Sequence, residues 1–266
     1  MKKIGSKLQW NGLAVHILAA IGLYYYWDPL FLIWFIIGHK LIMMIGDDIG
    51  LHRYFSHKTF KTTKFYENMF IFLTWFNIQG STIDWVARHR IHHAHTDKEK
   101  DPHPSTKWFT TYIWVDNYDK SKVSPFIIKD LLANKLHMFM HNYYFIGYWA
   151  MLLGFSLIFG FKFVLYFFVL NGVIGFHTAG WINVLCHKFG YRNFDTTDYS
   201  RNNNFVNMLH WGGGLHNNHH AFPKAYSNKV FNNDFDPSGW LIKTVFATNL
   251  SEIKTIADLQ VELNKS

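Results

Sequence analysis

Three groups of histidines constrain this chain of 266 residues more than any other feature. Two of them, His89 to His93 and His216 to His220, share the pattern HxxHH, and a third, HxxxxH, runs from His52 to His57. Residues three and four apart lie on one face of a helix, so each HxxHH segment, if helical, presents three imidazoles to one point. A fold that uses all three groups at one centre must bring distant segments together.

A metal centre is the chemistry that this pattern indicates. A single histidine on an apolar face is usually a satisfied core residue, but eight histidines in three groups with repeated spacing are not expected from core packing. Imidazole binds Fe, Zn, Cu and Ni, so the ligand type leaves the metal open. One ion rarely takes more than about six ligands, so eight histidines indicate two metal ions.

The composition favours a membrane protein over a nucleic-acid-binding protein. Hydrophobic residues make up 49% of the chain and aromatic residues 19%. The net charge is +8, but dispersed lysines carry most of it, which fits the cytoplasmic face of a membrane protein better than an Arg-rich patch for nucleic acid. The one cysteine, Cys186, excludes an intrachain disulfide and a cysteine-ligated Fe–S or zinc site.

Four apolar runs predict the membrane helices. In chain order they are Leu8–Trp27, Leu30–Gly46, Tyr143–Phe159 and Phe161–Leu185. A spanning helix needs about 20 mostly apolar residues, so the runs read as two hairpins that turn at Asp28-Pro29 and at Gly160. The basic start of the chain lacks a small-residue cleavage pattern, and the first run is therefore predicted to be a membrane helix and not a removed signal.

The predicted fold is an all-α integral membrane protein with four transmembrane helices in two hairpins, interfacial helices and a cytosolic cap rich in histidine. A single domain covers residues 1–266, with membrane hairpins at about 8–50 and 143–186 and cytosolic segments at about 51–142 and 187–266. Phe65 to Val86 carries several polar residues and is predicted to lie in the membrane interface as a helix.

Charge predicts the orientation of this multi-pass protein. The short loops on the far side carry Asp28 and Lys162, whereas Lys and Arg crowd the other side. The positive-inside rule then places all three histidine groups, the N-terminus, the Asp116 region and the C-terminus in the cytoplasm. His39 and Lys40 lie deep in the second apolar run, either as functional residues or, for Lys40, as a snorkelling side chain.

These motifs resemble those of the membrane-bound fatty acid desaturases, in particular the delta-9 type that acts on acyl-CoA or acyl-lipid. The three boxes are HRYFSH from His52, HRIHHAHTDKEKDPH from His89 and HNNHHAFP from His216. WINVLCHKFGYRNF before the third box and FDPSGWLI after it match as well. The resemblance extends from about Gly46 to Phe246.

The resemblance implies a metal-ligand set of nine histidines and one asparagine. The implied ligands are His52, His57, His89, His92, His93, Asn183, His187, His216, His219 and His220. Asn183, which holds a metal through water in that family, is four residues before His187 and so shares its helix face. Cys186 lies about 100° away from His187 and is expected to pack against apolar neighbours.

The resemblance also implies an oxidoreductase that uses a di-iron centre and O₂ to introduce a cis double bond, at delta-9, into a saturated acyl chain, with reduction of O₂ to water. Because no haem motif, flavin motif or cysteine cluster appears, electrons must come from a partner such as ferredoxin or a small haem protein. The acyl carrier (CoA, carrier protein or glycerolipid), the chain length and the bond position stay open.

Two other classes of function remain as alternatives. A di-iron hydroxylase or ketolase of the same histidine-box class would insert oxygen, although the strings HNNHHAFP and FDPSGWLI favour desaturation. A metal transporter or sensor would spread ionisable residues along the membrane path, whereas here they gather on one face.

Further residues are assigned by their surroundings in the sequence. An apolar tunnel for the acyl chain could be lined by Trp75, Phe76, Trp85 and Trp181, although core packing explains these aromatics equally well. His95 and His103 are predicted to lie behind the ligands or at the surface, and His137, His141, His177 and His210 to be structural.

The chain departs from the family's pattern in two places. The family's string GEGxHNxHH has a glutamate where this chain has Gly213. Asp47 and Asp48 precede the first box where close relatives often have small or hydroxyl residues. Neither change removes an implied ligand, but both leave room for altered substrate choice or reduced activity.

Asp48 is predicted to orient His52. It lies four residues earlier, hence on the same helix face, and metal-bound histidines often donate their second ring N–H to a carboxylate. The alternative is a surface aspartate that pairs with a lysine. His57 follows His52 by five residues and so lies about 140° around an α-helix from it. The two histidines are therefore predicted to bind different irons unless the helix breaks near Phe55.

Overall fold

The computed structural model describes residues 7–113 and 123–265, and the regular elements in these ranges are helical. Strand-like pairing among them is limited to two isolated bridges, Tyr191 with Asn202 and Asn202 with Leu215. The all-α fold class predicted from the sequence is confirmed. The Asp116 region, for which a cytoplasmic location is predicted, lies outside the described residues.

The N-terminal hairpin joins α1 (Lys7–Tyr26) to a second, longer helix. This second helix consists of a 3-10 turn, η1 (Pro29–Phe31), then α2 (Leu32–His39) and the π-helix η2 (Lys40–Ser56). Asp28 caps its start, because the Asp28 side chain accepts a hydrogen bond from the Leu30 N–H at 3.0 Å. Pro29 occupies the first helical position, where a missing N–H has little cost. The predicted turn at Asp28-Pro29 is confirmed.

The second hairpin joins α7 (Lys135–Phe159) to a helix made of α8 (Phe161–Val164), the π-turn η6 (Leu165–Val169) and α9 (Leu170–Leu185). Gly160 connects them with φ of +83°, a conformation that residues with a Cβ rarely adopt. α7 begins before the predicted start at Tyr143 and bends there, since Tyr143 has φ of −110° and ψ of 15°.

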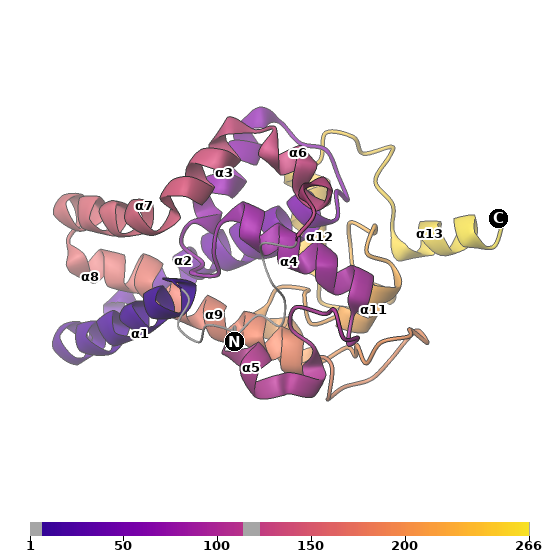
Figure 1. Ribbon diagram of the computed structural model, residues 1–266, viewed down its shortest axis with the longest axis horizontal. Helices are drawn as coiled ribbons and strands as arrows, with labels where there is room; N and C mark the ends of the chain where they lie inside the picture. The colour runs from indigo at the N-terminus through magenta and orange to yellow at the C-terminus, as the bar shows by residue number, and fades with distance from the viewer. Residues whose placement is uncertain (1–6, 114–122, 266) are drawn as a thin grey trace.

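The two hairpin turns lie at the same end of the helix bundle. Lys162 Nζ is 2.8 Å from Asp28 Oδ2, and the Asp28 N–H donates to the Tyr166 hydroxyl at 2.7 Å. Figure 1 shows α1, α7 and α8 projecting together on one side of the molecule, away from α11 and α13. Gly38 lets α2 approach η6 closely, because a Cβ there would collide with the backbone oxygen of Phe167.

Three helical stretches of the described chain are long and apolar enough to cross a membrane: Pro29–Ser56, Lys135–Phe159 and Phe161–Leu185. They support the membrane character predicted from composition. α1 is not among the three, so a fourth span remains a prediction. Its outer face nevertheless exposes large apolar side chains, among them Trp10, Leu13, Ile17 and Ile21.

The stretch predicted as a single interfacial helix, Phe65 to Val86, forms two helices, α3 (Lys64–Thr74) and α4 (Thr82–His95). The chain turns sharply between them, with φ of +51° at Ile78 and +101° at Gly80. Asn77 and Gln79, the polar residues that weaken the case for a span, are buried in this turn. The break lets α4, which carries the second histidine box, pack against η2.

Short helices complete the described chain around the histidine boxes. They are η3 (Ser105–Lys107), α5 (Trp108–Tyr112), η5 (Pro125–Ile128), α6 (Lys129–Leu132), α10 (Asn204–Leu209), α11 (His216–Ala221), α12 (Pro237–Leu241), η7 (Ile242–Phe246) and α13 (Ile256–Leu263). The third histidine box forms α11, and α12 packs against η2.

Candidate metal centre

The nine histidines of the implied ligand set converge in two groups. The first group contains His52, His57, His89, His93 and His219, and the second contains His92, His187, His216 and His220. Within each group the facing ring nitrogens all lie within 4.8 Å of one another. The side chains come from η2, α4 and α11 and from the residues just beyond η2 and α9, so the fold gathers all three sequence boxes at one place.

His219 lies at the centre of the first group. Its Nε2 is 2.9 Å from His52 Nε2 and 3.0 Å from His93 Nε2. On the other side of the group, His57 Nε2 and His89 Nε2 are 2.7 Å apart. Five imidazoles thus direct one nitrogen each toward a shared point, which is the arrangement of ligands around an ion.

The prediction that His52 and His57 bind different metals is wrong for this arrangement, because both belong to the first group. Their ring centroids are only 5.0 Å apart. The cause is the π-helix η2, in which hydrogen bonds link residues five apart, as in the 3.2 Å bond from the His57 N–H to the His52 carbonyl. The wider turn of a π-helix brings the fifth residue back toward the same side, where an α-helix would place it about 140° away.

Carboxylates stand behind histidines of both groups. His52 Nδ1 is 3.1 Å from Asp48, His92 Nδ1 is 3.0 Å from Asp101, His187 Nδ1 is 2.8 Å from Asp97, and His220 Nδ1 is 3.1 Å from Asp198. A carboxylate that accepts the Nδ1 proton fixes the tautomer in which Nε2 is free to bind a metal. Four of the nine histidines are therefore held in the metal-binding tautomer.

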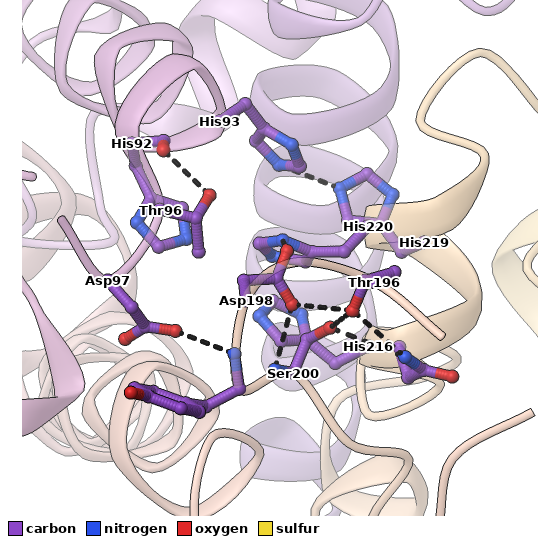
Figure 2. A network of polar contacts seen from close by, with 12 residues as sticks. His92, His93, Thr96, Asp97, Thr196, Asp198, Ser200, His216, His219 and His220 are labelled. Atoms are coloured by element: carbon purple, nitrogen blue, oxygen red, sulfur yellow. Dashed lines mark hydrogen bonds and ion pairs between the residues drawn. The ribbon is translucent and has the colours of Figure 1, made fainter. Parts of the chain in front are cut away.

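Two of these aspartates are themselves held by the loop that follows α9. Asp198 accepts hydrogen bonds from the Thr196 hydroxyl at 2.8 Å and from the Ser200 N–H at 2.9 Å (Figure 2). Asp97, just beyond α4, accepts the Tyr199 N–H at 3.0 Å. The loop thus ties the end of the second box to the third box through the carboxylates that orient the histidines.

The ring nitrogens that face one another fit metal ions. When Nδ1 donates its proton to a carboxylate, Nε2 carries a lone pair and can only accept. His92 Nε2 and His220 Nε2 are both buried without a hydrogen-bond partner in the described part of the chain, and His187 Nε2 lies 3.0 Å from His216 Nε2. Buried lone pairs directed at each other are unfavourable unless a cation lies between them. The residues present therefore fit one metal ion in each group.

Burial favours the neutral form of six of these histidines, which is the form that binds a metal. Burial, helped by neighbouring imidazoles, lowers the pKa of five of them well below the ordinary value: His57, His89, His93, His216 and His219. For His220, burial outweighs the hydrogen bond to Asp198 and lowers the pKa to about 4. The site is thus electrostatically prepared for a cation.

A buried charge network fixes Asp48 beside His52, as the spacing predicts. Asp48 Oδ2 accepts a hydrogen bond from Arg53 at 3.0 Å, and Arg53 also binds both oxygens of Asp236, at 2.9 and 3.0 Å. All three charged side chains are buried. The alternative of a surface aspartate paired with a lysine is therefore wrong.

A cavity of about 50 Å³ is lined by histidines of both groups. Its lining contains His52 and His89 from the first group, His92 and His216 from the second, and also Asp47, Trp85, Arg88, His103, Ala179, Ile182, Asn183, His210 and Gly213. Asn183, implied by the resemblance to hold a metal through water, is therefore placed at the cavity wall. A small molecule in this cavity would touch both histidine groups.

Of the four aromatic residues considered for a substrate tunnel, Trp85 alone lines this cavity. Trp75 and Phe76 are buried in the hydrophobic core, and Trp181 packs against Phe205. The core-packing interpretation therefore fits these three residues better.

Sequence reasoning missed the carboxylates Asp97, Asp101 and Asp198. Asp101 belongs to the DPH string at the end of the second box, but the string alone does not show that its carboxylate contacts His92. Asp97 and Asp198 meet histidines 90 and 22 residues away, so no local spacing reveals them. His103, predicted to lie behind the ligands or at the surface, stacks on His92 with ring centroids 4.5 Å apart and so lies behind a ligand.

Comparisons with known proteins agree with this geometry. The profile of the family described as fatty acid desaturase matches residues 29–229. The sn-1 stearoyl-lipid 9-desaturase of Anabaena variabilis is 34% identical over 199 residues, which cover 71% of this chain and 72% of that protein. The sn-2 palmitoyl-lipid 9-desaturase of Nostoc sp. (strain 36) is 31% identical over 249 residues, with 89% and 85% covered. The icosanoyl-CoA 5-desaturase of Limnanthes douglasii is 30% identical over 246 residues, with 90% and 69% covered.

The matched region contains all three histidine boxes, the second hairpin turn and the cavity that both histidine groups line. Identity of this extent, over most of both chains, goes beyond a shared motif. The chain therefore belongs to the fatty acid desaturase family and is an oxidoreductase that desaturates fatty acyl chains.

Proposed function

We propose that this protein uses two iron ions and O₂ to introduce a cis double bond at delta-9 of a saturated acyl chain. The observation that carries the proposal is the pair of histidine groups that both contribute to the wall of one cavity. The names of the Anabaena and Nostoc relatives support the delta-9 position. The name of the Limnanthes relative is the reason why the position must be measured directly.

The side chains would divide the work as follows. The first group would hold one iron, and the second group, with Asn183 through a water molecule, would hold the other. When bound, the two irons supply the oxidising power of O₂ that breaks an unactivated C–H bond, which acid–base side chains cannot do. Asp48, Asp97, Asp101 and Asp198 orient the imidazoles, and the apolar wall residues Trp85 and Ile182 keep bulk water from the cavity.

Electrons would come from a separate carrier such as ferredoxin or a small haem protein. Cys186 is the only cysteine of the chain, so the chain cannot hold a cysteine-ligated cluster of its own. It is fully buried, and burial raises its pKa, which disfavours the thiolate that binds metals. CoA, carrier protein or glycerolipid could carry the acyl chain.

We also propose that the metal centre lies on the cytoplasmic side of the membrane. The turns that carry Asp28 and Lys162 mark one end of the bundle, and the helix formed by η1, α2 and η2 runs from that end to the first box. The basic residues gather in the segments beyond the other end, as the positive-inside rule requires of cytoplasmic segments.

The decisive experiment is expression in a host without desaturases, followed by fatty-acid analysis that locates the double bond. A cis product unsaturated at delta-9 is expected. A hydroxylated or keto product would instead identify an oxygen-inserting relative. A double bond elsewhere would correct the position and leave the reaction type intact.

Single changes in the first group test the metal assignment. His93→Ala and His219→Ala are each expected to abolish the unsaturated product, since both nitrogens belong to one ligand group, while circular dichroism shows intact helices. His141→Ala is the matched control, because His141 contacts Ser81 and Asp84 but does not line the cavity. Metal analysis should find two irons per chain, and active protein that holds one zinc and no iron would refute the assignment.

A further inference from the structure

Gly213 leaves the cavity wall without the carboxylate that the string GEGxHNxHH would place there. The space is taken by His210, because a Cβ built on Gly213 would lie 2.5 Å from His210 Nδ1. A larger side chain at position 213 would therefore require His210 to move. A carboxylate nevertheless reaches this wall from η2, since Asp47 Oδ2 is 3.3 Å from His210 Nε2.

Asp47 and His210 form a buried pair that lines the cavity. Their residues are only 2% and 5% exposed. The second oxygen of Asp47 accepts a hydrogen bond from Asn77 at 3.2 Å, which fixes the carboxylate. Neither ring nitrogen of His210 makes a hydrogen bond within the described ranges. Nε2 lies at ion-pair distance from Asp47, whereas Nδ1, on the ring edge near Gly213, has no partner. A buried polar atom of this kind calls for a function or a ligand.

The reaction requires protons inside this buried site. Desaturation follows –CH₂–CH₂– + O₂ + 2e⁻ + 2H⁺ → –CH=CH– + 2H₂O. Two C–H bonds and the O–O bond break, and a second C–C bond and four O–H bonds form. The acyl chain is oxidised by two electrons and the external carrier supplies two more, so O₂ takes up four. Two protons must come from solvent through the protein.

Most ionisable side chains at the cavity are committed to other tasks. His52, His89, His92 and His216 belong to the metal groups, and Arg88 stays charged at any physiological pH. His103 stacks on His92, and burial lowers its pKa well below the ordinary value, which disfavours the charged form that a proton donor needs. Among the described residues of the wall, Asp47 and His210 remain.

We propose that His210, held by Asp47, is the proton donor of this desaturase at the cavity lined by both histidine groups. The inference rests on the proposed function, because the protons are needed only if O₂ is reduced to water. In each cycle His210 passes a proton from Nδ1 to an oxygen atom in the cavity, recovers one from solvent and passes a second. The carboxylate of Asp47 stabilises the charged imidazole between transfers.

The charges around His210 suit this role. Burial opposes a charge on the ring, but the carboxylates of Asp47 and, behind it, Asp48 raise the pKa of His210 above its ordinary value. The other ionisable groups that face it or share the cavity wall are His39 and His52 from the helix of the first box, Arg88, His89, His92 and His103 from the second box, and His216 from the third. The charged form of His210 is thus more favoured than that of a histidine free in water.

The test uses the iron-loaded, full-length protein with its electron carrier. His210→Gln is expected to keep the wild-type iron content but to turn over about 100-fold more slowly. Wild-type activity should fall as pH rises through the pKa of His210, and His210→Gln should lose this alkaline limb. Asp47→Asn keeps the shape but removes the charge, so the limb should move to lower pH. His141→Gln, which removes another histidine beside an aspartate, is the matched control and should behave as wild type.

The outcomes separate clearly. Wild-type turnover with the same alkaline limb in His210→Gln overturns the proposal, and so does loss of iron together with turnover, since that indicates a structural role. If His210→Gln does not fold, the pH profile of Asp47→Asn tests the proposal instead. An alkaline limb at the same pH as in the wild type would then overturn the proposal. Wild-type protein that makes no unsaturated product would instead overturn the proposed function.

A rescue experiment tests whether His210 stands in for a carboxylic acid at position 213. Gly213→Glu alone should be inactive, because the new side chain collides with His210. Combined with His210→Ala, which opens that space, the glutamate should raise turnover at least about 10-fold above His210→Ala alone. If the double variant turns over no faster than His210→Ala, a glutamate at position 213 does not replace His210 as the proton donor.

Discussion

Asp48 joins the first histidine group to the buried charges of the cap, since one of its oxygens contacts His52 and the other contacts Arg53. Asp48→Asn keeps the shape but weakens the bond that fixes the His52 tautomer. We expect iron affinity to fall by about 10- to 100-fold, measured by iron titration. Equal iron content and turnover in this variant would exclude Asp48 as the orienting group.

Asp236→Asn provides the matched control for Asp48. It removes the other carboxylate that binds Arg53 but leaves the contact between Asp48 and His52 in place. We expect a lower melting temperature, because Arg53 is buried, with an iron affinity close to that of the wild type. Similar iron loss in both variants would show that the network acts only through folding.

The neutral histidines make the stability of the metal-free protein depend on pH. The folded-state pKa of His220 is about 4, whereas a histidine in the unfolded chain titrates near 6.5. Between these values the unfolded chain binds more protons, so stability is lost as pH falls from about 6.5 toward 4, at about 1.4 kcal/mol per pH unit for such a group. The pKa of His219 is lowered in the same direction.

Thermal melts of the metal-free protein between pH 8 and 5 should therefore show a melting temperature that is flat above about pH 7 and falls below it. Protons also compete with metal for the same nitrogens, so bound iron should be released over the same acidic range. A melting temperature that rises on acidification would mean that these histidines are charged in the folded protein.

At the residue scale, spacing in the sequence predicts contacts between residues of one helix but not contacts between distant segments. The contact between Asp48 and His52 could be predicted because the two residues are four apart. Asp97 and Asp198 could not, because loops bring them to His187 and His220. His210 was predicted to be structural, since nothing in the sequence shows that η2 places Asp47 beside it.

At the scale of elements, the sequence predicts where the helices turn but does not predict which type of helix forms. Asp28-Pro29 and Gly160 end the helices for reasons that belong to those residues alone, a capping side chain, a missing N–H and a positive φ. The π-helix that brings His57 round to His52 has no comparable local signature. Its hydrogen-bond register depends on packing against α3 and α4, which sequence periodicity does not reveal.

The close packing of the two hairpins can be tested at Gly38. A Cβ at this position would collide with the backbone of Phe167 and the amide of Asn171, neither of which can move aside cheaply. Gly38→Val is expected to lower the melting temperature of the detergent-purified protein markedly. Gly154→Val on α7 is the control, because a Cβ there meets nothing within 4 Å. Equal melting temperatures in the two variants would contradict this packing.

At the scale of the whole molecule, the fold separates the end that carries the two hairpin turns from the end that carries the histidines. The paired turns at Asp28 and Lys162 close one end, and the charged, hydrogen-bonded cap closes the other around the histidines. Hydropathy predicted the helices that are long enough to span, but the number of crossings depends on α1, which is less apolar than the other three. Orientation follows from charge alone and is therefore the whole-molecule property that most needs a direct test.

Cysteine labelling in intact cells provides that test, because the native cysteine is not expected to react. Cys186 is fully buried, and burial raises its pKa, so an alkylating reagent should leave it unmodified. Trp27→Cys places an exposed thiol at the far turn, and Asn232→Cys places one on the cap. A membrane-impermeant maleimide should label the first variant in intact cells and the second only after lysis. The reverse pattern would mean that the orientation is inverted. Labelling of both variants in intact cells would mean that the two sites lie on the same side, which contradicts an odd number of crossings between them and a cytoplasmic metal centre.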